Sequence, residues 1–177
     1  VTSKEAVASA KGRLDWSKTF NWRVELDASN IDPSMLLPEW PGRLNTTLSS
    51  EGRLEGGQWF ASADIGQLSG TLRGYPLSLS SQLSWQGDHL DIAQLDLLSG
   101  TSRLTLAGLA GDSLSLNWSL ASTNLAELYP QATGQLQGKG RLSGPTASPQ
   151  IQASFSGEAL QLLDYRVGSI EGDADID

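Results

Sequence analysis

Apolar and polar side chains alternate residue by residue in Leu114-Ser115-Leu116-Asn117-Trp118-Ser119-Leu120. A β-strand points successive side chains to opposite faces, so this pattern predicts a strand with one apolar side and one polar side. The same alternation recurs from Phe20 to Ala28 and from Leu77 to Trp85. The repeated pattern predicts a protein built almost entirely from strands with one apolar side and one solvated side.

Turn signals separate these strands and indicate a meander between residues 68 and 120. Glycine-containing turns such as Gln86-Gly87-Asp88 and Ala110-Gly111-Asp112 join consecutive apolar-polar stretches. The alternation changes phase once, between Ile92 and Leu95, and this predicts a β-bulge that re-aims the strand.

Two segments interrupt the strand pattern. Residues 30–38, in which Asp32 can cap, and residues 122–130 each end at a proline, so we expect a short capped helix in each. Residues 1–11 are small, polar and mildly helix-favouring, and we expect a short helix or a frayed terminus there.

An internal repeat relates the two halves of the chain. Asn21-Trp22 matches Asn117-Trp118, and Gly52-Arg53-Leu54 matches Gly140-Arg141-Leu142, at offsets of 96 and 88 residues. We therefore expect one region, residues 1–177, made of two pseudo-repeats at roughly 12–105 and 106–177. Chance similarity in a chain rich in Leu, Ser and Gly is the alternative interpretation.

Composition excludes several classes of function. The chain of 177 residues carries a formal net charge of −8, and its 12 basic residues are scattered singly. A nucleic-acid backbone or an anionic lipid surface needs a basic patch, so neither is expected as a partner. The absence of cysteine rules out disulfides and thiolate metal sites. No apolar run approaches the ~18 residues of a membrane span. We also expect this chain to be a piece of a longer protein.

No catalytic motif is visible, and we predict no enzyme, no cofactor and no metal site. His89 is the only histidine, and no serine lies in a G-x-S-x-G motif. Gly138-Lys139-Gly140 lacks the third glycine of a dinucleotide fingerprint, and residues 173–177 lack the Gly and Glu of a calcium loop.

The apolar side of the strands is unusual in being built from leucine. The chain has 29 Leu against 6 Ile and 4 Val, although strands ordinarily favour β-branched residues. Leucine is less restricted at χ1, so a leucine-lined face makes a softer surface than a closely fitted core. Such a face suits a fluid or variable partner, and packing of the face against itself is the alternative.

About ten strands at ~4.8 Å spacing would form a sheet ~50 Å wide, which two short helices cannot cover. The sheet must therefore close into a barrel, fold into a sandwich or stay open as a half-pipe. In the half-pipe, we expect a hydrophobic groove lined by Trp22, Val24, Leu26, Leu77, Leu79, Leu83, Leu114, Leu116, Leu120, Leu136, Ile151 and Phe155.

Three motifs carry a resemblance to a known family. Leu-x-Leu-x-Trp-x-Leu at 114–120 is followed by Asn-Leu-x-x-Leu-Tyr-Pro at 124–130 and by Gln-Leu-x-Gly-x-Gly-Arg-Leu-x-Gly at 135–144. This succession resembles the repeated signature of the TamB family of AsmA-like proteins. The resemblance covers essentially the whole chain, which looks like a C-terminal-region fragment of an enterobacterial member.

The resemblance implies an all-β fold: a curved, mostly antiparallel sheet folded into a U-shaped half-pipe, or β-taco, with an apolar concave face. It also implies the periplasmic part of a single-pass inner-membrane protein of a Gram-negative bacterium, with its anchor outside this chain. The implied partner is the outer-membrane barrel TamA. The implied roles in the translocation and assembly module are insertion of outer-membrane β-barrel proteins and autotransporters, and phospholipid transport; no catalytic residues are implied.

We therefore expect a non-enzymatic groove segment that carries phospholipid acyl chains or unfolded outer-membrane protein strands. One alternative is a chaperone-like template on which client strands pair with exposed sheet edges. Another, from a different class, is a carbohydrate-binding or adhesin-like β-sandwich, for which the 6 Trp would supply stacking surfaces.

Overall fold

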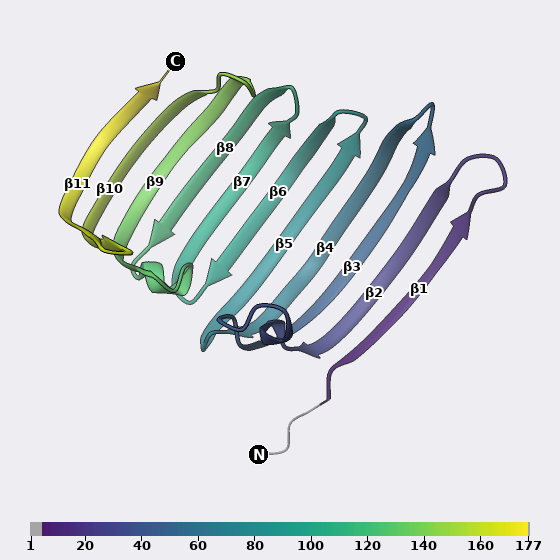
Figure 1. The fold of residues 1–177 in the computed structure, drawn as a ribbon, viewed down its shortest axis with the longest axis horizontal. Coiled ribbons are helices and arrows are strands. Elements are labelled where there is room, and N and C mark those ends of the chain that lie inside the picture. The colour runs from purple at the N-terminus through teal and green to yellow at the C-terminus, as the bar shows by residue number, and fades with distance from the viewer. Residues whose placement is uncertain (1–4, 177) are drawn as a thin grey trace.

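The computed structural model describes residues 5–176, which form one curved antiparallel sheet of eleven strands (Figure 1). Each strand pairs with its neighbours in sequence, and the order from edge to edge is β1 to β11. The sheet stays open, because β1 and β11 do not pair with each other. The strands are β1 (Val7–Asp15), β2 (Asn21–Ile31), β3 (Gly42–Glu55), β4 (Gln58–Leu72), β5 (Tyr75–Gln86), β6 (His89–Ser99), β7 (Ser102–Ala110), β8 (Ser113–Ser122), β9 (Ala132–Pro145), β10 (Gln150–Leu162) and β11 (Tyr165–Ile176).

The register carries the sequence alternation from strand to strand. Leu26 of β2 lies opposite Leu48 of β3, which lies opposite Ile65 of β4. Directly opposed residues project to the same face, so these side chains form rows across the sheet. We call this face the leucine face; it carries Trp22, Val24, Leu26, Leu48, Ile65, Leu68, Leu77, Leu79, Leu83, Ile92, Leu95, Leu97, Leu104, Leu106, Leu114, Leu116, Trp118, Leu120, Leu136, Leu142, Ile151 and Phe155. The opposite side is the polar face.

Register shifts keep the leucine face continuous. The predicted bulge between Ile92 and Leu95 is confirmed, since the pairing of β6 with β7 shifts there. A further shift separates Ile65 and Leu68 of β4, and another lies between Glu158 and Gln161 of β10. A slip of one residue would move every following side chain to the other face, so each bulge restores the phase of its strand.

The prediction of two short helices is wrong, because the corresponding segments are single 3₁₀ turns. These are η1 (Pro33–Met35) and η2 (Leu125–Glu127). The predicted cap at Asp32 is confirmed, because its side chain accepts a hydrogen bond from the Ser34 amide; in the second segment the capping residue is Asn124, whose side chain accepts one from the Ala126 amide. The proline that ends each segment follows too soon after the cap for a stable α-helix to form.

The predicted N-terminal helix is wrong for residues 7–11, which belong to β1. Val7 lies opposite Ser29, and Lys11 lies opposite Glu25 of β2. Pairing with a neighbouring strand outweighs a weak helical propensity. Residues 1–4 of that predicted segment lie outside the described residues.

The two 3₁₀ segments end in the same way. The Arg73 amide donates to the Pro41 carbonyl over 2.6 Å, and the Leu163 amide donates to the Gln131 carbonyl over 3.1 Å. Arg73 and Leu163 also share a positive φ, of 53° and 54°. The division into pseudo-repeats at roughly 12–105 and 106–177 stays a prediction.

One margin of the leucine face is covered by η2. Ser99 Oγ donates to the Glu127 carbonyl over 2.7 Å, and the buried Ser102 Oγ lies 2.7 Å from the Glu127 carboxylate. Both serines project from the leucine face, so η2 must lie on that side of the sheet. The Arg73 guanidinium donates to the Ala126 carbonyl and stacks over the Trp40 ring at 4.8 Å. Arg73 therefore links η2 to the segment that follows η1.

Glu127 fixes the turn between β6 and β7. Its carboxylate accepts hydrogen bonds from the Thr101 amide over 2.8 Å and from the Ser102 amide over 2.9 Å. Partial burial raises the pKa of Glu127, but the hydrogen bonds from Ser102 and Thr101 outweigh burial and leave the pKa below its ordinary value. The charged form is therefore favoured in the folded protein.

Gly108→Ala should lower the free energy of unfolding by about 2 kcal/mol or more. Gly108 has a φ of 129°, and a Cβ at this position would lie 1.9 Å from the Ser115 carbonyl oxygen. The measurement is denaturant unfolding, with Gly168→Ala as the control because a Cβ there meets nothing within 4 Å. Equal stability of the two variants would contradict the close approach of β7 and β8.

Glu127→Gln should lower the free energy of unfolding at pH 7 by about 1 kcal/mol, a modest value because the carboxylate is partly solvated. A folded-state pKa below the unfolded value contributes stability that is present above the unfolded pKa and lost as the pH falls through the folded pKa. The difference between wild type and variant should therefore vanish at acidic pH. Denaturant titrations between pH 7 and acidic pH measure this difference in the free energy of unfolding. A difference that does not depend on pH would exclude a role for the Glu127 charge.

Candidate functional site

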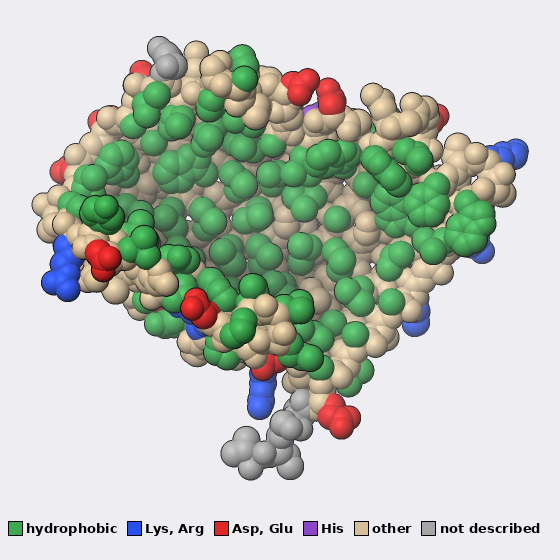
Figure 2. Space-filling view, viewed as in Figure 1, with side chains coloured by type: hydrophobic (Ala, Val, Ile, Leu, Met, Phe, Trp, Pro, Cys, Tyr) green, Lys and Arg blue, Asp and Glu red, His purple; other side chains and the backbone are tan. Residues whose placement is uncertain are grey.

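All of the predicted groove residues project from the leucine face. Hydrophobic side chains gather over this face, whereas Lys, Arg, Asp and Glu lie mainly along its margins (Figure 2). The structure brings these residues into rows that cross the sheet, and their role in binding stays a prediction. The residues are Trp22, Val24 and Leu26 of β2; Leu77, Leu79 and Leu83 of β5; Leu114, Leu116 and Leu120 of β8; Leu136 of β9; and Ile151 and Phe155 of β10.

One row shows how continuous the face is. It begins at Val24 in β2 and reaches Ile151 in β10 with one residue from each strand between them. The row is mostly hydrophobic but contains small residues, whose side chains project less far from the sheet. In order, it consists of Val24, Ser50, Ala63, Leu83, Ile92, Gly108, Leu116, Leu142 and Ile151.

The leucine face has no covering layer in the described part of the chain. Leu77, Ile92 and Ala132 are the buried hydrophobic residues there, and the other large hydrophobic side chains keep some contact with solvent. A compact domain of this length would ordinarily bury ~70% of its unfolded surface around a core. Away from the margin that η2 covers, residues 5–176 place no second layer on this face, so its outer surface is available to another molecule.

An aromatic cluster occupies one corner of the leucine face. The Trp22 ring centroid lies 5.8 Å from that of Phe20 and 5.8 Å from that of Trp59. The Trp22 ring also lies against Gly52, where a Cβ would come 2.3 Å from the indole. Phe20 and Trp59 were not among the predicted groove residues, although their alternation with polar neighbours places them on the same side as Trp22.

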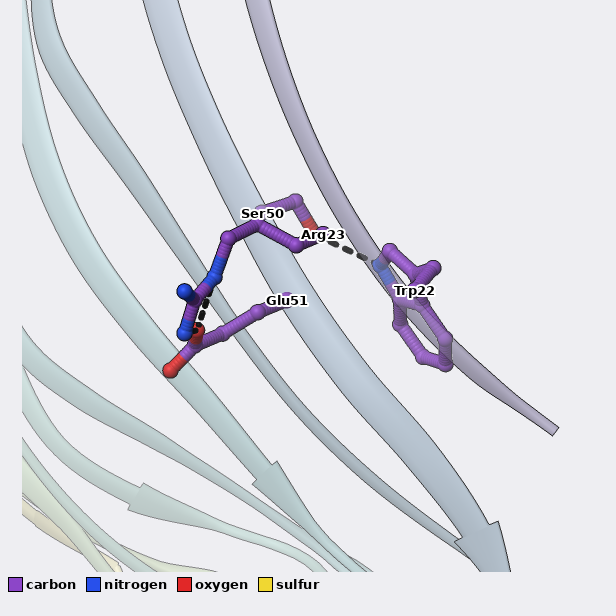
Figure 3. Close-up of polar contacts among 4 residues, drawn as sticks. All are labelled: Trp22, Arg23, Ser50 and Glu51. Carbon is purple, nitrogen blue, oxygen red and sulfur yellow. Dashed lines mark hydrogen bonds and ion pairs between the residues drawn. The ribbon is translucent and has the colours of Figure 1, made fainter. Parts of the chain in front are cut away.

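Adjacent residues of β2 show how sharply the two faces divide. The Trp22 indole N–H donates to Ser50 Oγ over 3.1 Å on the leucine face, while Arg23 turns to the other side and its Nε donates to Glu51 over 2.9 Å (Figure 3). The indole therefore has its polar group satisfied while its ring stays available for apolar contact.

The polar face carries exposed ion pairs between neighbouring strands. Arg23 pairs with Glu51, and Arg103 pairs with Asp96. The hydrogen bond and the charge of Asp96 raise the pKa of Arg103. Two clefts, of about 960 and 820 Å³, open between side chains of this face, including Arg23, Glu51 and Arg141. Such exposed pairs contribute little to stability but keep this side solvated.

The described residues offer no arrangement for catalysis. His89 lies at an exposed turn with its ring nitrogen 3.1 Å from Asp88, and no nucleophilic side chain is hydrogen-bonded to it. Within residues 5–176, His, Asp and Glu nowhere gather in a group that could hold a metal ion. Over the same residues, no helix is long and apolar enough to cross a membrane.

Comparison with known proteins relates the whole chain to one family. Residues 1–177 match the family model described as "TamB, N-terminal domain". The expectation of a C-terminal-region fragment is not confirmed, because the matching model is that of the N-terminal domain. No solved structure matches the chain.

A curated relative is the translocation and assembly module subunit TamB of Haemophilus influenzae (strain ATCC 51907 / DSM 11121 / KW20 / Rd). It is 22% identical over 175 residues, which are 97% of this chain and 14% of the relative. This chain thus spans about 14% of the length of the relative that it matches.

The family model extends over every residue, and the alternating motifs that resemble the family form neighbouring strands of one open sheet. The family is that of a non-enzymatic component of the translocation and assembly module. This chain belongs to the TamB family.

Proposed function

We propose that the leucine face binds extended apolar chains, and that the protein is a groove segment of the translocation and assembly module. The observation that carries the proposal is the uncovered row of hydrophobic side chains running from β2 to β10. A continuous apolar surface that is exposed to water usually marks a site where a protein contacts a partner.

Differences in exposure support a concave leucine face, as in a U-shaped half-pipe. In β3, Leu44 and Leu48 are half-buried, whereas Asn45 and Ser49 between them are exposed. η1 contacts one end of β3, but the alternation of exposure runs along the whole strand from Gly42 to Glu55, so it arises mainly within the sheet. Side chains on the inside of a curved sheet converge and screen one another, whereas those on the outside spread apart.

Phospholipid acyl chains fit this surface on energetic grounds. Burying one methylene stabilises a complex by ~0.8 kcal/mol, so about a dozen methylenes would hold a tail without any polar recognition. The leucine side chains can adjust their rotamers to a chain that varies in length and shape. The polar margins would remain available to the headgroup.

The name of the relative supports a place in the translocation and assembly module. In that setting the chain would be a periplasmic segment of an inner-membrane protein and would work with the outer-membrane barrel TamA. It would support the insertion of outer-membrane β-barrel proteins and autotransporters by carrying apolar chains between the two membranes. The length of the row across the sheet suits an extended cargo.

A second candidate is a chaperone-like template for client β-strands. Within residues 5–176, β1 and β11 each pair with one neighbouring strand. An incoming strand could add to such an edge through backbone hydrogen bonds. The carbohydrate-binding or adhesin-like sandwich is not retained, because residues 5–176 form one sheet and contain no second sheet to pack against it.

Leu116→Asp should reduce bound phospholipid on the order of tenfold, since a carboxylate beside an acyl chain loses solvation without gaining a partner. Leu116 lies between Gly108 and Leu142 near the middle of β8. The protein is purified from a Gram-negative host, and its bound phospholipid is extracted with organic solvent and quantified by mass spectrometry. The amount of lipid per protein is then compared with that of the wild type.

Ser115→Asp is the matched control, because Ser115 is the preceding residue of the same strand and projects from the polar face. It adds the same charge and should leave bound lipid unchanged. Both variants need the thermal stability of the wild type. Undiminished lipid in a folded Leu116→Asp protein, or no lipid in the wild type, would overturn the lipid proposal and favour strand templating.

A further inference from the structure

The two margins of the leucine face, where the strands end, are built differently (Figure 1). Along one margin, which we call the strap margin, the connections include η1 and η2. The opposite margin, which we call the turn margin, is formed by the connections that join β1 to β2, β3 to β4, β5 to β6, β7 to β8 and β9 to β10. Both margins consist of connections between paired strands.

The strap margin is closed by polar contacts between η2 and the sheet. Beneath η2, the row of residues nearest this margin contains Ser99, Ser102 and Ser122, which are 3%, 0% and 2% exposed. Ser102 Oγ lies 2.7 Å from Ser122 Oγ and 2.7 Å from the Glu127 carboxylate. An acyl chain that crossed this margin would have to displace these buried hydrogen bonds, which is costly.

Arg73 fixes η2 a second time, from the turn between β4 and β5. Its guanidinium donates to the Ala126 carbonyl and stacks over the Trp40 ring at 4.8 Å and over the Tyr75 ring at 5.8 Å. Glu127 holds η2 at the turn between β6 and β7. Together, η2 and the Arg73 side chain form a strap that joins these two turns and closes this end of the leucine face.

The turn margin is instead lined with exposed indole rings. Trp59 and Trp85 project from the leucine face, opposite Leu54 and Ala61, and are 46% and 42% exposed. The Trp85 indole N–H donates to the Gly87 carbonyl over 2.8 Å, so its polar group is satisfied while the ring stays open to apolar contact. Hydrophobic side chains reach this margin in the space-filling view (Figure 2). Tryptophan suits a boundary that is apolar on one side and wet on the other.

Charge distinguishes one part of the turn margin. Residues 13–23 and 51–60, around the aromatic cluster, carry four basic side chains against three acidic ones, in a chain with 12 basic and 20 acidic residues. The next two turns along this margin carry Asp88 and Asp112 and contain no Lys or Arg. A phosphate at the turn margin would therefore be best placed beside the aromatic cluster.

These observations leave the leucine face one closed margin and one open margin within residues 5–176. We propose that a phospholipid enters the leucine face over the turn margin at the aromatic cluster and keeps its headgroup there, while its acyl chains lie on the leucine face. This inference rests on the proposed binding of phospholipid and adds to it the side of entry and the position of the headgroup.

The test measures how fast the intact chain takes up phospholipid from vesicles. The chain contains no cysteine, so Trp59→Cys and Tyr129→Cys each provide a single position for a bulky sulfonated maleimide. The vesicles consist of phosphatidylethanolamine and phosphatidylcholine with a small fraction of phospholipid that carries a fluorescent acyl chain. The adduct at position 59 should slow uptake about tenfold relative to the same variant without the adduct, because it places charge in an apolar path.

Tyr129→Cys is the matched control, because Tyr129 is also aromatic, is 45% exposed and follows η2 on the strap margin. Its adduct should leave the rate of uptake unchanged. Both labelled variants need the thermal stability of the wild type; if Trp59→Cys lacks it, Leu54→Cys takes its place, since Leu54 lies opposite Trp59.

Equal slowing by the two adducts would overturn the inference and leave lipid binding in place. The same holds if the adduct at position 59 does not slow uptake. A wild-type chain that takes up no phospholipid would overturn the lipid proposal and this inference with it.

Discussion

The hydrogen bonds between neighbouring strands hold this structure together, because no second layer packs against the sheet within residues 5–176. Each strand is held by hydrogen bonds to its neighbours in sequence, and the eleven-stranded sheet contains no crossover between distant segments. Register is therefore the quantity on which the fold depends. Leu48 stays on the same side as Leu26 and Ile65 only because the ladder places them opposite one another.

The absence of a layered core links stability to function. Side chains such as Leu79 and Leu97 contact each other within the face, yet their outer surfaces stay open. Local contacts stabilise the sheet instead, such as the hydrogen bonds that Glu127 accepts at the turn between β6 and β7. The same openness that limits stability leaves a continuous apolar surface for a partner, which is the property the proposed function requires.

Much of the fold could be predicted because the alternation of apolar and polar residues is a local signal. Leu114 to Leu120 indicated a one-sided strand, and the phase change after Ile92 indicated a bulge; both have counterparts in β8 and β6. The helix prediction failed at Pro33 and Leu125, since capping residues specify where a turn begins and not how far it continues. For residues 7–11 we expected a short helix or a frayed terminus, because local propensity contains no information about their pairing with β2.

The candidate face was predictable to a similar extent. The alternation of apolar and polar residues alone grouped Trp22, Leu79 and Leu116, which lie on different strands of one face. Parity could not reveal that η2 covers the serines at one margin, because those contacts join Glu127 to a turn 25 residues earlier in the chain. Nor could it reveal the stacking of Phe20, Trp22 and Trp59, which depends on side-chain geometry across three segments.

The most direct test of an apolar-chain binding face is site-specific photo-crosslinking in living Gram-negative cells. Benzoylphenylalanine at Leu79 would report on the leucine face, and at Ser78 on the polar face of the same strand. We expect phospholipid-mass adducts at position 79 and none at position 78. Equal adducts at the two positions, or none at position 79, would contradict it.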